Sequence, residues 1–190
     1  AHYSAISDDG ITFTMEPGTL FGDDEWTDEW WGPHVKAKVL SDGQLRIYKG
    51  ITSWKKENSG IISYISSDWF TFTKEDGLRI SAAEAGVEKL SHLTIVSTAD
   101  GTYRGYLSNM PENIDPTRLV KSATSSDLFT WTMDSGVRLG TGASPTTAAD
   151  YSAEQPHALQ RKDGCVTLFY ASTHYKNEIR QPDIRYSTSA

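Results

Sequence analysis

The feature that most constrains the fold of this chain is a short pattern that occurs three times at a fixed spacing. The copies begin at Ser7, Ser66 and Ser125, so that each starts 59 positions after the one before. An Asp, an aromatic residue, a Thr and a Gly recur in register: Asp9, Asp68 and Asp127; Phe13, Phe72 and Trp131; Thr14, Thr73 and Thr132; Gly18, Gly77 and Gly136. Repetition at a fixed period indicates one supersecondary unit that is stacked several times.

Each copy has the sequence pattern of two strands joined by a turn. Apolar runs at 61–65 and 119–123 precede the Asp in two copies, and a Thr-aromatic-Thr segment follows it. We expect the Asp carboxylate to fold back onto backbone N–H groups of the turn, and the aromatic residue to anchor the second strand in the core. Catalysis rarely needs three copies of a residue, so these positions are interpreted as structural.

The rest of each period supplies two more strands. Asp-Gly pairs at 42–43, 100–101 and 163–164 are flanked by apolar segments, which is typical of β-hairpins. No segment has a convincing apolar stripe with the 3.6-residue period of a helix. The last of these hairpins is expected to end in a polar loop that begins at His174.

Four short strands per repeat are typical of a β-propeller blade. We therefore predict an all-β, propeller-like fold with four-stranded blades and about three blades in one domain. The expected units are a partial blade at 1–21, blades at 31–81 and 89–140, and a partial blade at 154–190. Propellers close with roughly four to eight blades. The chain is thus expected to be a piece of a longer protein, a ring completed by a second copy, or an open arc, and the first two are favoured.

Composition excludes some kinds of partner. The net charge is −7, and no basic cluster is present, which argues against nucleic acid or an anionic membrane as a partner. No apolar run approaches the roughly eighteen residues of a membrane span. The single Cys165 lies in a strand-like apolar run, where a buried, inert thiol is the expected state.

Two segments carry a family resemblance. One is Ser125-x-Asp127-Leu128-x-x-Trp131 before a Gly turn, and the other runs from Glu154 through Asp163-Gly164 to Tyr170. The second segment contains Glu154, Pro156, His157, Asp163, Gly164, Leu168, Phe169 and Tyr170. Together they resemble the blade pattern of the five-bladed propeller glycosidases, namely the arabinanases and β-xylosidases of glycoside hydrolase family 43 and their fructosidase relatives.

The resemblance implies a glycoside hydrolase that cleaves arabinose- or xylose-type glycosides, with Glu154 as the general acid. It also favours an extracellular or periplasmic location. Glycoside hydrolysis uses two carboxyl groups on either side of the bond, one protonated and one ionised. Asp28, Glu29 and Glu88 are loose candidates for the second group, and the family's base can also lie in a blade outside this chain. The alternative is that these carboxylates, Glu154 included, are solvated or cap a strand.

An acidic, Trp-rich segment is the stretch least typical of a core. Trp26, Trp30 and Trp31 lie among carboxylates, a combination that suits carbohydrate binding, because flat rings stack on sugar faces and carboxylates accept hydroxyl protons. An equally weighted alternative is a loop buried over the ring or in a subunit contact. No cofactor is expected, although four carboxylates of this segment are a weak Ca²⁺ candidate: Asp23, Asp24, Glu25 and Asp28.

Three histidines, His34, His92 and His157, are expected at the same place in the first strand of successive blades. Packing between repeats is the favoured role. The alternative is that they line the central channel and bind substrate or an ion.

Two functions from different classes remain. In one, the chain is glycoside hydrolase-like and Glu154 protonates the leaving group. In the other, it is a non-catalytic propeller module that binds a carbohydrate or a protein partner. Fold alone does not decide between them.

Overall fold

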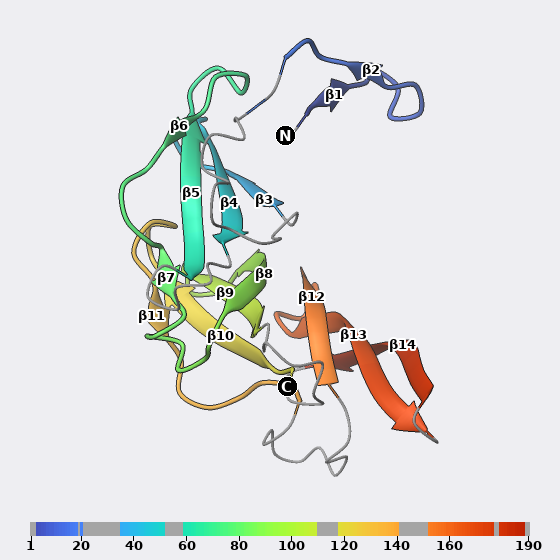
Figure 1. Cartoon of the computed structure of the whole chain (residues 1–190). Coiled ribbons are helices and arrows are strands. Elements are labelled where there is room, and N and C mark those ends of the chain that lie inside the picture. Colours follow the sequence, from blue (N-terminus) through green and yellow to red (C-terminus); the bar gives the residue numbers. More distant parts are fainter. Residues whose placement is uncertain are drawn as a thin grey trace.

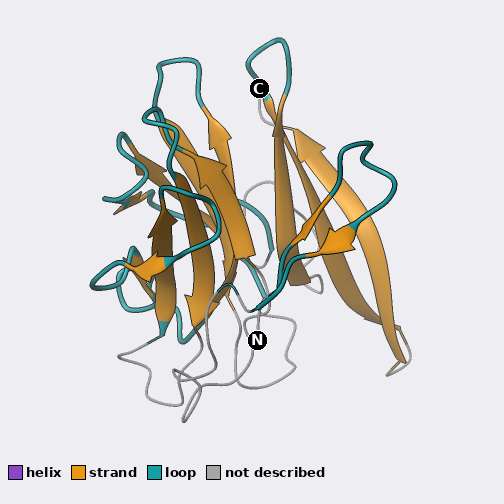
Figure 2. Ribbon diagram, turned by 90° about the horizontal axis from the view of Figure 1, so that it is seen from above, coloured by secondary structure: helices purple, strands orange, loops and turns teal. Residues whose placement is uncertain are grey.

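The computed structural model describes residues 3–18, 20, 35–51, 59–109, 118–140, 152–176 and 179–188. Within these ranges the regular structure consists of strands, and no helix is present (Figure 2). The described part of the chain accordingly holds no helix that could span a membrane. The prediction of an all-β fold is confirmed.

The strands form four antiparallel sheets in chain order. The N-terminal hairpin pairs β1 (Ala5–Ile6) with β2 (Thr14–Met15). The second sheet contains β3 (Val35–Val39), β4 (Leu45–Ile51), β5 (Gly60–Ser66), β6 (Thr73–Lys74) and β7 (Ile80–Ser81). The third contains β8 (Leu90–Ser97), β9 (Tyr103–Asn109), β10 (Val120–Ser125) and β11 (Thr132–Met133). The fourth contains β12 (Ser152–Gln160), β13 (Val166–Lys176) and β14 (Ile179–Thr188).

The sheets follow one another around an open arc (Figure 1). Strand order within a sheet follows the sequence, as β3-β4-β5-β6, β8-β9-β10-β11 and β12-β13-β14, and β7 adds a short extra pairing to β5. The first strand β8 contacts both β4 and β12, so the sheets pack face to face through their early strands. This succession of antiparallel sheets, with up to four strands in sequence order in each, is propeller-like, as the repeat predicts.

Sequence and structure agree at the hairpins and differ at one strand end. Gly43, Gly101 and Gly164 have positive φ angles of 85°, 82° and 85°, which suits the Asp-Gly turns. The loop predicted from His174 is wrong, because β13 continues to Lys176 and pairs along its length with β14. β13 is longer than predicted because it pairs with the long strand β14, and this pairing cannot be inferred from the local sequence pattern of β13.

The core consists of separate clusters between neighbouring sheets. Tyr48 and Ile61 of the second sheet pack against Leu90 and Leu107 of the third. A second cluster joins Val120 of the third sheet and Leu168 of the fourth, among other residues. Central strands are therefore buried on both faces, which explains why β5 is apolar at consecutive positions.

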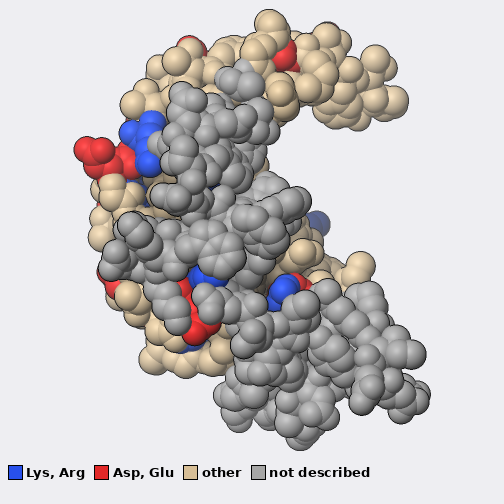
Figure 3. All heavy atoms as spheres, viewed as in Figure 1, with Lys and Arg blue, Asp and Glu red and all other residues tan. Residues whose placement is uncertain are grey.

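One close approach shows how tightly β4 and β8 meet. A Cβ atom added at Gly50 would lie 2.7 Å from the backbone oxygen of Ser91, so only glycine fits there. On the surface, charges are mixed. On the face drawn in Figure 3, Lys and Arg atoms of described residues lie close to Asp and Glu atoms in several places.

The repeated turn has the same hydrogen bonds in all three copies. The Asp9 carboxylate accepts from the N–H groups of Ile11 and Thr12, both at 2.7 Å. Asp68 and Asp127 accept from the two corresponding N–H groups at 2.7–2.9 Å. The structural role predicted for the repeated Asp is confirmed.

The repeated aromatic residue, which is predicted to anchor the second strand in the core, does so in two of the three copies. Trp131 packs against the cluster between the second and third sheets, and Phe72 packs against a smaller cluster on the second. Phe13 is 62% exposed, so the prediction of a core anchor is wrong in the first copy. The reason is that burial of this side chain depends on a neighbouring sheet, which the repeat itself does not supply.

Candidate functional site

Glu154, the predicted general acid, lies on β12, the first strand of the fourth sheet. It is 5% exposed, although a carboxylate is rarely so buried without a partner. The pairing of β12 with β13 is irregular between Glu154 and His157, and Gln155 has a positive φ of 52°. Such a bulge re-aims the side chains beside it, and bulges are frequent next to active sites.

The partner of Glu154 is Arg118, which precedes β10 in the third sheet. An Arg118 guanidinium nitrogen (Nη1) forms an ion pair with Oε2 of Glu154. The two segments are also joined by the backbone, since the Ala153 N–H donates to the Arg118 carbonyl oxygen at 2.8 Å. The side chains of Arg118 and Glu154 are 21% and 7% exposed, so this is a largely buried pair that links two sheets.

The ion pair defines what Glu154 can do as it stands. A guanidinium in contact favours the ionised form of a carboxylate. An ionised carboxylate accepts hydrogen bonds and stabilises positive charge, whereas a general acid has to carry a proton. Glu154 is thus arranged as a fixed acceptor unless Arg118 moves away.

Counting from the hairpin identifies the residue that matches Glu154 in the third sheet. Thr98 and Arg161 occupy equivalent positions at the start of the Asp-Gly turns of the third and fourth sheets. Each donates its N–H to a carbonyl oxygen on the other side of the turn. Seven positions before them stand Ser91 and Glu154. The third sheet therefore has Ser91 at the position that Glu154, the predicted acid, occupies in the fourth sheet. Glu88 lies before β8 and is exposed, so the structure does not bring it to this place.

His92 belongs to a hydrogen-bonded cluster on the inner strand β8. Its ring nitrogen Nδ1 lies 2.9 Å from Oγ of Ser91 and 3.2 Å from Oγ of Ser108. His157 is exposed and lies two positions nearer its hairpin than His92 does. The two histidines therefore do not share one place in their sheets, because His92 stands six positions before Thr98 and His157 stands four positions before Arg161.

Several predicted site residues lie outside the described residues. These are the candidate carboxylates, tryptophans and histidine of the first part of the chain: Asp28, Glu29, Trp26, Trp30, Trp31 and His34. The candidate Ca²⁺ ligands lie there as well: Asp23, Asp24, Glu25 and Asp28. Within the described ranges, no group of three or more His, Cys, Asp or Glu side chains is placed to hold a metal ion.

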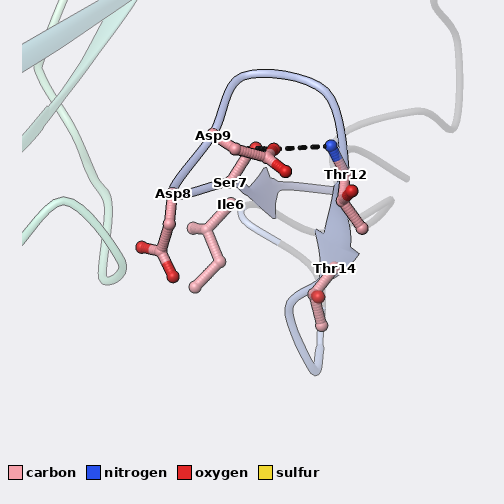
Figure 4. Close-up of a pocket in the computed structure, with 6 residues that line it drawn as sticks. All are labelled: Ile6, Ser7, Asp8, Asp9, Thr12 and Thr14. Atoms are coloured by element: carbon pink, nitrogen blue, oxygen red, sulfur yellow. Dashed lines mark hydrogen bonds between the residues drawn. The ribbon is translucent and has the colours of Figure 1, made fainter.

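A hollow on the N-terminal hairpin is a pocket that the sequence did not predict. It measures about 240 Å³ and is lined by the repeated turn and the strands beside it (Figure 4): Ile6, Ser7, Asp8, Asp9, Thr12 and Thr14. The N–H groups of Thr12 and Ile11 and the Ser7 hydroxyl lower the pKa of Asp9 to about 2. Oδ1 of Asp9 already accepts the hydrogen bonds of the turn, so we assign no function to this hollow.

Arg118, Ser91 and Ser108 are the residues that sequence reasoning missed. Arg118 is 36 positions from Glu154, and no repeat or motif marks it. The register of the hairpins, by contrast, could have indicated Ser91, because its distance from the Asp-Gly turn is readable in the sequence.

No family model and no curated protein matches the sequence. Solved structures do match. An endo-arabinase from Bacteroides thetaiotaomicron aligns with a TM-score of 0.70 and 10% identity, over 94% of this chain and 63% of that protein. An α-L-arabinanase from Penicillium chrysogenum, complexed with arabinobiose, aligns with a TM-score of 0.64 and 15% identity, over 100% of this chain and 55% of that protein.

A family 117 glycoside hydrolase from Zobellia galactanivorans aligns with a TM-score of 0.62 and 16% identity, over 83% of this chain and 53% of that protein. The chain thus spans between half and two thirds of the length of these three proteins. Likeness at such low identity establishes the fold, and the fold is the one shared by the five-bladed β-propeller glycosidases.

Proposed function

We propose that this protein acts on arabinose- or xylose-type glycosides and that Glu154 is the carboxyl group at the sugar bond. The observation that carries the proposal is the placement of Glu154, buried beside a bulge on the first strand of a sheet that contacts the first strand of its neighbour. First strands packed in this way lie toward the inside of the arc. The fold likeness to arabinanases adds support, since one of them is described in complex with arabinobiose.

Hydrolysis sets two further requirements. Glu154 can protonate a leaving oxygen only after Arg118 has withdrawn from it and the carboxylate has taken up a proton from solvent, so the incoming sugar has to displace the guanidinium. A second carboxyl group is also needed, and an inverting pair stands roughly 6.5–9.5 Å apart. We assign that role to Asp28 or Glu29 of the Trp-rich segment, whose rings would stack on the sugar.

A second candidate function is carbohydrate binding without cleavage, and the Arg118–Glu154 pair favours it. A carboxylate held ionised by a buried guanidinium accepts hydroxyl hydrogen bonds without any change of protonation. In that case Glu154 orients the sugar, and no second carboxyl group is required.

The experiment compares wild type with Glu154→Gln on aryl α-L-arabinofuranoside and aryl β-D-xyloside substrates. Hydrolysis by Glu154 predicts that the variant loses at least about 100-fold in kcat, the usual weight of a general acid. Glu88→Gln is the matched control, because Glu88 is an exposed carboxylate outside the strand and should leave the rate unchanged. Full activity of Glu154→Gln would remove Glu154 from the mechanism.

Binding measurements separate the two candidates. If wild type turns over neither substrate but binds arabino-oligosaccharides, and if this binding is weakened in Glu154→Gln and lost in Trp30→Ala, the binding module is the correct assignment. Circular dichroism of each variant verifies that the fold is retained.

A further inference from the structure

Ser172, on the central strand β13 of the fourth sheet, has a buried hydroxyl with no hydrogen bond to account for it. Its side chain is 0% exposed, and among the residues that the structure describes its Oγ has no hydrogen-bond partner. A buried hydroxyl that makes no hydrogen bond destabilises a fold, so its presence calls for an explanation.

Other serines that are equally buried do have partners. Ser63 donates to Glu75 at 2.7 Å, and Ser122 donates to Asp134 at 2.6 Å, and both serines are 0% exposed. A serine with a structural role in this fold is therefore hydrogen-bonded, and Ser172 departs from that rule.

The Ser172 side chain faces the third sheet. It continues a row of alternate β13 residues, Val166, Leu168 and Tyr170, which pack into the cluster between the third and fourth sheets. Alternate residues of a strand share one face. Ala153, the Cα partner of Ser172 on β12, belongs to the same cluster. The hydroxyl thus occupies a position where the row would otherwise place an apolar group.

This position lies beside the Arg118–Glu154 ion pair. Ala153, opposite Ser172, directly precedes Glu154 and donates its N–H to the Arg118 carbonyl oxygen at 2.8 Å. Directly opposite residues of an antiparallel pair have Cβ atoms about 4.5–5.5 Å apart. The Ser172 side chain is therefore next to the main chain of both members of the ion pair.

The proposed hydrolysis requires the Arg118 guanidinium to leave Glu154, and the main chain restricts where it can go. The Arg118 carbonyl is held by Ala153, and the N–H of the next residue, Leu119, donates to Oδ1 of Asn109 at 2.7 Å. The guanidinium therefore moves by rotation about its side-chain bonds. Because a guanidinium cannot lose its charge, it needs an acceptor in the buried place to which it moves.

We propose that Ser172 is a positioning residue whose hydroxyl oxygen accepts an N–H of Arg118 when a sugar displaces the guanidinium from Glu154. A hydroxyl oxygen has two acceptor lone pairs, so it suits a guanidinium N–H. The hydroxyl is then satisfied in the sugar-bound state and unsatisfied in the state with the ion pair. The inference rests on the proposed hydrolysis, because binding without cleavage needs no withdrawal of Arg118.

Ser172→Ala tests the inference through two measurements with different expected signs. The Tm should stay the same or rise by up to about 4 °C, because the variant removes an unsatisfied buried hydroxyl. The value of kcat/KM on an aryl α-L-arabinofuranoside should fall at least about tenfold, the weight of one hydrogen bond to a charged group. A serine with only a structural role would lower the Tm when substituted.

A double variant tests the link to Arg118. No guanidinium is displaced in Arg118→Gln, so adding Ser172→Ala should lower kcat/KM no further, whereas independent residues would multiply their effects. If Arg118→Gln does not fold at the assay temperature, Ser172→Thr takes its place. This variant keeps a hydroxyl and should retain the activity that Ser172→Ala loses.

Ser122→Ala is the matched control, since the equally buried Ser122 is bonded to Asp134 and accepts from Arg138 at 2.9 Å. It should lower the Tm and leave kcat/KM unchanged. The inference alone is overturned if wild type is active and Ser172→Ala keeps wild-type kcat/KM, lowers the Tm as Ser122→Ala does, or adds its full loss to that of Arg118→Gln. A wild type that cleaves no aryl glycoside overturns the proposed hydrolysis and this inference with it.

Discussion

Tyr48 and Leu128, eighty positions apart in the sequence, are joined by a hydrogen bond from the tyrosine hydroxyl to the leucine carbonyl oxygen. Tyr48 is 1% exposed and also meets Trp131 edge to face, with ring centroids 6.2 Å apart. Two copies of the repeat unit are thus connected at one buried point, which makes the contact between sheets specific as well as apolar.

Tyr48→Phe should lower the free energy of unfolding by about 1 kcal/mol, because the variant keeps the ring and removes only the hydroxyl donor. Urea unfolding at neutral pH measures the difference. Tyr186→Phe is a suitable control, since Tyr186 is 72% exposed and its substitution should change stability little. Equal stability of Tyr48→Phe and wild type would show that the Leu128 carbonyl finds another donor.

Leu128→Ala should cost about 3 kcal/mol, the usual range for removing a buried Leu side chain. Leu128 is 2% exposed and has a φ of 62°, whereas Trp69 occupies the same turn position with a φ of 69° but is 48% exposed. Trp69→Ala is therefore the matched comparison and should cost clearly less. If both substitutions cost the same in thermal and urea unfolding, the turn geometry and not the packing determines the loss.

Acid should weaken the turns that the repeated Asp residues hold together. Hydrogen bonds from Thr71, Phe70 and Ser66 lower the pKa of Asp68, so folding favours its ionised form. Its contribution is fully present above the unfolded pKa of about 3.9 and is lost as the pH falls through the lower folded value. Unfolding free energies measured from pH 5 down to pH 2 should fall less steeply for Asp68→Asn than for wild type.

Asp8→Asn is the control for this pH series, since Asp9 and not Asp8 accepts the turn hydrogen bonds of the first copy. A pH profile of Asp68→Asn that superimposes on that of wild type would contradict the assignment.

Arg118→Gln should lower stability by about 3 kcal/mol, because it leaves the Glu154 carboxylate buried without its counter-charge. Arg161→Gln is the matched control. Arg161 pairs with Asp163 at 2.8 Å, but both side chains are about half exposed, and pairs of that kind contribute little. Similar unfolding midpoints for the two variants would show that Glu154 is not held by Arg118 in solution.

The repeat alone predicted the local structure correctly. An Asp side chain can accept hydrogen bonds from the N–H groups two and three positions after it without any distant partner, so the turns of Asp9, Asp68 and Asp127 follow from their own neighbours. The Asp-Gly hairpins and the strands flanking them are local in the same sense, and four such strands per period led to the propeller-like fold.

The tertiary structure decided what those strands meet. Whether the repeated aromatic is buried, as at Trp131, or exposed, as at Phe13, depends on a neighbouring sheet that no local pattern encodes. The partner of Glu154 is set in the same way, because Arg118 reaches it from another sheet across the packed interface. The hydrogen bonds of a turn are determined by residues that are adjacent in the sequence. Packing between sheets depends instead on strand register and on bulges, which form only when the whole chain folds.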